Sequence, residues 1–180
     1  CEDVKPGQVP EKFNPVSSYV KYFTLPEYMA GMRIFISFQG AESGLAVWCN
    51  GHYAGYGEDG FTPSEFELTE YLVPGENKLA AQVFQYTNAS WMEDQDFFRF
   101  SGIFREVFLY AVPAVHVRDM KITTPLADGF ASGEVRVALE AAGEGHAALR
   151  LYDGETQIAG SSISLPAESE AVLPVDHPRL

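Results

Sequence analysis

Apolar and polar residues alternate with a period of two along most of the chain, which is typical of β-strands with one buried face. In residues 33–38, for example, Ile34, Ile36 and Phe38 fall on one face. Helical spacing is confined to single turns. The first part of the chain therefore predicts about eight short strands, among them residues 17–24, 33–38, 45–49, 52–56, 64–68, 78–86 and 106–112.

Turn signals separate these strands. Asn50-Gly51 lies between two apolar runs, and this dipeptide favours a tight hairpin because both of its residues tolerate a positive φ. The sequence Pro-Gly-Glu-Asn at residues 74–77 predicts a second turn. Short strands joined by such turns predict an all-β fold, with a β-sandwich over residues 1–112.

Residues 113–180 continue in the same style with smaller apolar side chains. Strands are predicted at 115–123, 133–140, 147–152 and 156–165, with a hairpin turn at Asp153-Gly154. This pattern predicts part of an immunoglobulin-like β-sandwich.

Composition changes at the same place. Of 24 aromatic residues, 22 lie in residues 1–112, and only Phe130 and Tyr152 follow. We therefore predict two domains, residues 1–112 and 113–180, that meet near Pro113. The second is short, so we expect it to be incomplete and the chain to be a piece of a longer protein.

The balance of 12 basic and 25 acidic residues gives a net charge of −13. This charge argues against nucleic acid or an anionic membrane as a partner, because both bind basic surfaces. No apolar run is long enough to span a bilayer. The two cysteines, Cys1 and Cys49, make no disulfide framework, and Cys49 is predicted to be a buried thiol. Few cysteines and no visible signal sequence favour the cytoplasm, with the periplasm as the alternative.

Residues 91–102 combine three carboxylates, four aromatic residues and Arg99. One reading is sugar recognition, in which rings pack on a pyranose while carboxylates accept hydrogen bonds from its hydroxyls. A second is a solvated acidic loop, in which Arg99 pairs with one acid and the aromatic side chains fill the core. A third is a calcium loop, although the spacing of an EF-hand is missing.

Other catalytic signals are weak. The four histidines have no partner at zinc-ligand spacing, and His52 is predicted to be a strand-edge residue. The motifs of serine hydrolases, zinc proteases, phosphate-binding loops and dinucleotide-binding folds do not occur.

Several blocks, in order along residues 14–112, resemble the N-terminal sugar-binding domain of β-galactosidases of glycoside hydrolase family 2. They are Val-Trp-Cys-Asn-Gly (47–51), Gly-Tyr-Gly-Glu-Asp (55–59), Pro-Ser-Glu-Phe (63–66), Pro-Gly-Glu-Asn (74–77), Glu-Asp-Gln-Asp (93–96) and Ser-Gly-Ile-Phe-Arg (101–105). The resemblance implies a jelly roll for the first domain. Residues 113–180 are similar in position to the family's next domain, which is immunoglobulin-like.

The resemblance also implies a role. In the family, two carboxylates on a TIM barrel perform retaining hydrolysis of terminal β-galactosides. That barrel lies outside this chain, so no catalytic residue is expected here, and the fragment alone is expected to be inactive. Asn14 and Asp96 match residues that contact galactose. A stand-alone carbohydrate-binding module and a purely structural sandwich stay as alternatives.

Cofactors and partners follow from the same resemblance. Asp96 matches a ligand of a sodium ion whose other ligands lie on the barrel, and the family's magnesium ligands lie there too. We therefore expect neither ion to bind tightly to this chain alone. The expected partners are a β-galactoside and the TIM barrel of the full-length protein. Whether the parent enzyme is a homo-oligomer is left open.

Overall fold

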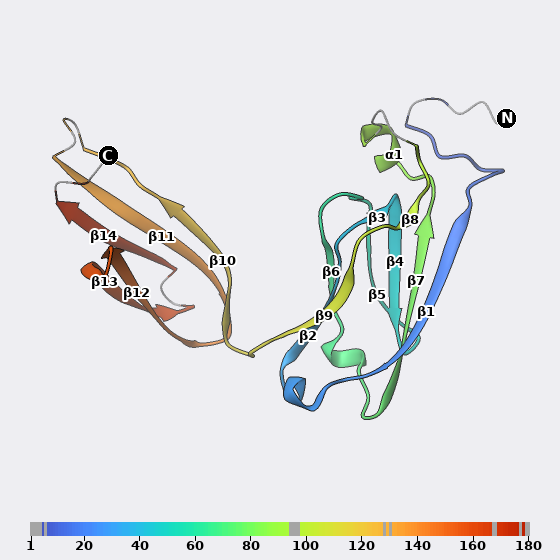
Figure 1. Cartoon of the computed structure of the whole chain (residues 1–180), viewed down its shortest axis with the longest axis horizontal. Helices are drawn as coiled ribbons and strands as arrows, with labels where there is room; N and C mark the ends of the chain where they lie inside the picture. Colours follow the sequence, from blue (N-terminus) through green and yellow to red (C-terminus); the bar gives the residue numbers. More distant parts are fainter. Residues whose placement is uncertain are drawn as a thin grey trace. The chain divides into compact units, whose positions relative to one another are not determined.

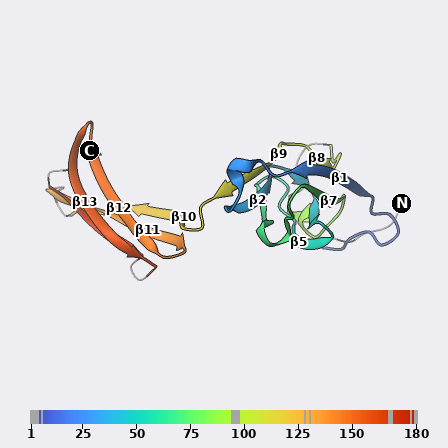
Figure 2. The same ribbon diagram turned by 90° about the horizontal axis from the view of Figure 1, so that it is seen from below.

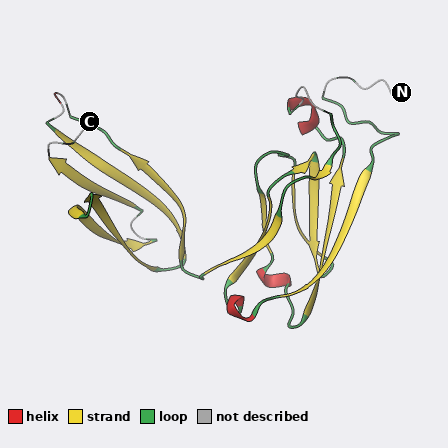
Figure 3. Cartoon of the chain, in the orientation of Figure 1, coloured by secondary structure: helices red, strands yellow, loops and turns green. Residues whose placement is uncertain are grey.

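The computed structural model describes residues 5, 7–93, 98–127, 129, 131–166, 169–176 and 178. The chain divides into two compact units, Cys1–Ala111 and Val112–Leu180, which are treated separately below. Strands dominate both units, and the helices are single turns (Figure 3). The all-β class predicted from the alternating pattern is confirmed.

Unit 1 is a sandwich of antiparallel strands (Figure 1). One sheet has the order β1-β7-β4-β5, a second has the order β6-β2-β9, and β3 pairs with β8. The strands are β1 (Val16–Thr24), β2 (Arg33–Phe38), β3 (Ala41–Glu42), β4 (Gly44–Cys49), β5 (His52–Gly57), β6 (Ser64–Glu67), β7 (Glu76–Phe84), β8 (Gly102–Ile103) and β9 (Val107–Val112). Three short helices accompany them: η1 (Glu27–Met29), η2 (Thr69–Tyr71) and α1 (Ala89–Met92).

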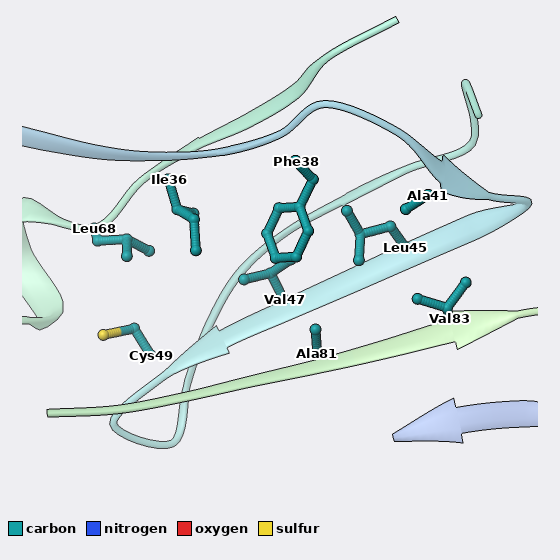
Figure 4. Packing of buried hydrophobic residues seen from close by; sticks show 9 residues of the cluster. All are labelled: Ile36, Phe38, Ala41, Leu45, Val47, Cys49, Leu68, Ala81 and Val83. Atoms are coloured by element: carbon teal, nitrogen blue, oxygen red, sulfur yellow. The ribbon is translucent and has the colours of Figure 1, made fainter. Parts of the chain in front are cut away.

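The core of unit 1 lies between these sheets, and alternate residues supply it. Ile36 and Phe38 point inward from β2, while β4 and β7 contribute residues of the same period (Figure 4). The complete cluster is Ile36, Phe38, Ala41, Leu45, Val47, Cys49, Leu68, Ala81 and Val83. Cys49 is a free, fully buried thiol, as predicted, and burial raises its pKa.

The Asn50-Gly51 hairpin is confirmed. Asn50 has φ 51° and Gly51 has φ 85°, so both occupy the left-handed region that this turn requires. The Asn50 side chain also ties the hairpin to its neighbours. Its amide donates to the Tyr71 carbonyl oxygen at 2.8 Å, and its Oδ1 accepts from the Lys78 N–H at 2.8 Å.

Unit 2 has a sheet of order β10-β11-β14 and a separate hairpin. The two strands of the hairpin, β12 and β13, lie side by side in both views (Figures 1 and 2). The strands are β10 (His116–Thr123), β11 (Ser132–Ala142), β12 (Gly145–Asp153), β13 (Thr156–Leu165) and β14 (Glu170–Asp176). Its core contains Val137, Leu139, Ile163, Leu165 and Ala171. The strand β14, which contains Pro174, was not predicted from the sequence. Proline is tolerated there because β14 is an edge strand.

Candidate functional site

Asn14 lies beside the segment that follows β7. Its Nδ2 donates to the Tyr86 carbonyl oxygen at 2.8 Å, and its Oδ1 accepts from the Tyr86 N–H at 3.0 Å. The Gln85 N–H donates to the Pro15 carbonyl oxygen at 3.0 Å. The carboxamide thus continues the β1–β7 ladder, because it offers the same donor and acceptor as a peptide group. Its orientation is therefore fixed, and the two bonds use one N–H and one oxygen lone pair of a carboxamide that offers two of each.

The helix α1 follows directly after this contact and leads into the acidic segment. Its indole at Trp91 donates from Nε1 to the Gln8 carbonyl oxygen at 2.7 Å, so the residues before β1 run beside it. Figure 1 shows α1 at one end of the sandwich, beyond the end of β7. The structure therefore brings Asn14 and the start of the acidic segment to the same end of unit 1.

Asp94, Gln95, Asp96 and Phe97 lie outside the described residues. The predictions that rest on Asp96, both sugar contact and sodium ligation, therefore stay predictions. The calcium-loop alternative depends on the same residues. Among the residues that the structure does describe, no group of three His, Cys, Asp or Glu side chains is placed to hold a metal ion.

Arg99 joins the two sides of the acidic segment. Its Nη1 donates to the Ser90 carbonyl oxygen at 3.0 Å, and its own carbonyl oxygen accepts from Gln85 Nε2 at 3.4 Å. Its charge also acts on Glu42, whose side chain is only 6% exposed. Burial raises the pKa of Glu42, the positive charge of Arg99 opposes this shift, and the charge of Glu93 adds to it.

Three buried hydroxyl groups meet where α1 packs on the sandwich, and α1 itself supplies one of them, that of Ser90. Ser43 Oγ hydrogen-bonds to Thr87 Oγ1 and, at 2.8 Å, to Ser90 Oγ, which also accepts from the Thr87 N–H at 2.9 Å. All three residues are buried. This group of hydroxyls was not predicted from the sequence, because isolated serines and threonines carry no spacing signal.

Phe98 and Phe100 are 82% and 84% exposed, and their ring centroids lie 5.9 Å apart. The alternative in which the aromatic side chains of this segment fill the core is wrong for these two residues. Trp91 and Met92 are exposed as well. This end of the sandwich therefore presents aromatic and apolar side chains to its surroundings beside a segment rich in carboxylates.

Comparison with known proteins identifies the family. Residues 3–113 match the family model described as the sugar-binding domain of glycosyl hydrolases family 2. The chain belongs to this family. The jelly-roll sandwich and the resemblance inferred from the ordered sequence blocks are thereby confirmed.

Among the proteins of family 2 that are similar to this chain are much longer proteins. The chain is 44% identical over 177 residues to a β-galactosidase from Clostridium acetobutylicum, which covers 97% of this chain and 20% of that protein. It is 49% identical over 143 residues to a β-galactosidase from Streptococcus thermophilus, covering 79% of this chain and 14% of that protein. The chain thus spans about a fifth or less of the length of these relatives.

Solved structures support the family 2 fold. The crystal structure of Ruminococcus gnavus β-glucuronidase superposes with a TM-score of 0.73 over 91% of this chain and 29% of that one, at 24% identity. At this identity the likeness shows the fold alone.

Among the described residues of this family 2 chain, no helix is long and apolar enough to cross a membrane.

Proposed function

We propose that this chain is the non-catalytic sugar-binding region of a β-galactosidase and forms one wall of its galactoside site. The parent reaction is retaining hydrolysis of terminal β-D-galactosides, which needs two carboxylates about 5 Å apart. In this proposal those carboxylates lie on a TIM barrel outside the chain. Asn14 and Asp96 bind the galactose from this side of the site.

One observation carries the proposal. Asn14 is locked against Tyr86 by two hydrogen bonds, and the chain runs from Tyr86 through α1 to the acidic segment. Asn14 and Glu93, at the start of the segment that contains Asp96, therefore lie at one end of the sandwich. Relatives that are 42–49% identical over most of this chain are β-galactosidases, which favours galactosides over glucuronides.

The metal ions belong to the same proposal. Asp96 is proposed as one ligand of a sodium ion whose remaining ligands lie outside this chain, as do the ligands of magnesium. The described residues supply no complete site of their own. A single carboxylate binds sodium weakly, so the 180-residue chain should need no added metal to fold.

The decisive experiment compares this chain with the longer gene product that includes a barrel. We expect the purified 180-residue chain to show no turnover of o-nitrophenyl galactoside and the longer product to hydrolyse it. In the longer product, Asp96→Asn should lower kcat/KM about tenfold or more, because a hydrogen bond to a charged group contributes about 1.5–3 kcal/mol. The matched control is Asp119→Asn on β10, which should change neither rate nor sodium dependence. Turnover by the chain alone, or an unchanged Asp96→Asn enzyme, contradicts the proposal.

The exposed rings of Phe98, Phe100 and Trp91 favour a second candidate, a carbohydrate-binding module that acts alone. Calorimetric titration of the 180-residue chain with galactose separates the two. One wall of a shared site should give no measurable heat of binding, whereas an independent module should bind and lose its affinity in Phe98→Ala.

A further inference from the structure

The loop between β5 and β6 is joined to α1 by two carboxylates that reach in opposite directions. Glu58, on the loop, accepts from the Ala89 N–H at the start of α1, with Oε2 at 3.2 Å. Glu93, just after α1, accepts from the Gly60 N–H on the loop, with Oε1 at 2.9 Å. We call these two contacts the carboxylate bridges. Each segment therefore gives one carboxylate and receives one.

The Glu58 bridge takes the place of a local helix cap. The residue before α1, Asn88, makes no side-chain capping bond, and a helix of four residues has too few hydrogen bonds of its own to be stable. Glu58 supplies the missing acceptor from the loop after β5. The carboxylate is itself held, because Tyr56 donates its hydroxyl to Glu58 Oε1 at 2.9 Å. Burial and this hydrogen bond both raise the pKa of Tyr56.

Glycine at the far end of the Glu93 bridge leaves room for the carboxylate. A Cβ on Gly60 would lie 3.1 Å from Glu93 Oε2, which is tighter than ordinary van der Waals contact. Glu93 Oε2 is buried and finds no hydrogen-bond donor among the described residues. The Gly60 amide therefore supplies a hydrogen bond to this carboxylate, which also interacts with the side chain of Asp59 on the same loop.

The bridges act on the part of the chain that the proposed function uses. Glu93 directly follows α1 and lies three residues before Asp96 in the sequence. The Trp91 side chain of α1 contacts the segment that leads to Asn14. A shift of α1 against the loop would move the start of the acidic segment relative to Asn14. Displacements of about 1 Å at a binding constellation can cost up to about 100-fold in rate.

We propose that Glu58 and Glu93 are positioning residues of the sugar site, which set α1 and the start of the acidic segment against the β5–β6 loop. This inference rests on the proposed function. It assigns these carboxylates no contact with the sugar and no part in the chemistry.

The test uses the longer gene product and o-nitrophenyl galactoside. Glu58→Ala and Glu93→Ala should each raise KM about tenfold, with a smaller change in kcat, because the binding wall is displaced while the barrel is unaltered. Glu58→Gln and Glu93→Gln should restore KM to within about twofold, because the amide oxygen still accepts from the same N–H group. In Glu58→Gln, the Tyr56 hydroxyl can accept from the new amide instead of donating.

The matched control is Glu65→Ala on β6. Glu65 also accepts from a tyrosine hydroxyl, that of Tyr110 at 2.9 Å, but among the described residues it makes no hydrogen bond to α1. Glu65→Ala should leave KM within about twofold of the wild-type value. Hydrogen exchange of the 180-residue chain gives a second readout: the Gly60 amide should exchange faster in Glu93→Ala but not in Glu93→Gln.

The outcomes are distinguishable. If the wild-type product hydrolyses galactoside and the alanine variants keep its KM, the positioning role is overturned and the proposed function stands. If alanine and glutamine variants are equally impaired, hydrogen-bond positioning is overturned in the same way. If the wild-type product hydrolyses no galactoside, the proposed function is overturned and the positioning role falls with it.

Discussion

At the scale of single residues, Ser90 shows how one small polar residue can connect separate parts of the fold. Its hydroxyl is buried and meets the Ser43 hydroxyl and the Thr87 N–H. Its carbonyl oxygen accepts from Arg99. One residue thus connects the interior of the sandwich to both sides of the acidic segment.

Ser90→Ala should lower the free energy of unfolding by about 1–3 kcal/mol, because the buried Thr87 N–H loses its acceptor and the Ser43 hydroxyl keeps only its bond to Thr87. Urea denaturation of the 180-residue chain measures this change. Ser18→Ala on β1 is the matched control. Within the described residues its exposed hydroxyl meets Gln82 alone, at 3.5 Å, so the loss should be within about 0.5 kcal/mol. Equal losses in both variants would contradict the role of burial.

Glu42 gives a prediction about pH. Burial raises its pKa above the ordinary value of 4.5. A carboxyl whose pKa is raised in the folded state favours folding below the unfolded pKa and loses that contribution as pH rises through the folded pKa. Glutamine does not titrate. The free energy of unfolding of Glu42→Gln, relative to wild type, should therefore increase between pH 4 and pH 8. A difference that is constant or shrinks over this range would contradict the prediction.

At the scale of elements, β5 packs its backbone unusually closely against a neighbouring side chain. A Cβ on Gly55 would lie 2.4 Å from Cδ1 of Phe66, whose ring packs on the core and meets Phe38 edge-on. The glycine is needed here for space, since its φ is not in the left-handed region.

Gly55→Ala should destabilise unit 1 by about 1–3 kcal/mol, because the Phe66 ring must leave its position. Adding Phe66→Leu should make room for the new methyl group. The double variant should then be less destabilised than the sum of the two single variants. Thermal or urea unfolding of the four proteins completes the cycle, and strict additivity would show that the two positions do not interact.

Element prediction succeeded where one strand carries its own signal. Alternation located β2, and the Asn50-Gly51 turn located the hairpin of β4 and β5. It failed for β3 and β8, which are two residues each and exist only because they pair with one another. Two residues are too few to show an alternation of apolar and polar positions, so no local pattern in the sequence predicts these strands.

At the scale of the whole molecule, the chain holds two hydrophobic clusters that share no residue. Leu45 is buried in the first and Leu139 in the second. The units therefore differ in what stabilises them, and each core can be altered on its own.

Leu45→Ala and Leu139→Ala should each cost about 2–5 kcal/mol, by loss of buried surface and formation of a cavity. Hydrogen exchange should show faster exchange in β4 and β7 for the first variant and in β11 and β13 for the second. Each variant should leave the amides of the other unit unchanged. A response of both units to either variant would show that they unfold as one.

The sequence by itself determined the all-β class, the main strands and the family, because alternation, turn dipeptides and ordered motif blocks are local signals. It also singled out Asn14 as a candidate contact. Only the tertiary structure decided that the Asn14 amide pairs with Tyr86, that Ser43, Thr87 and Ser90 share one buried group, and that two carboxylates join α1 to the β5–β6 loop. These hydrogen bonds join residues that lie 31 to 72 positions apart in the sequence. The side chains that make them carry no periodic signal. These side chains come into contact only because the strands that carry or flank them pack together.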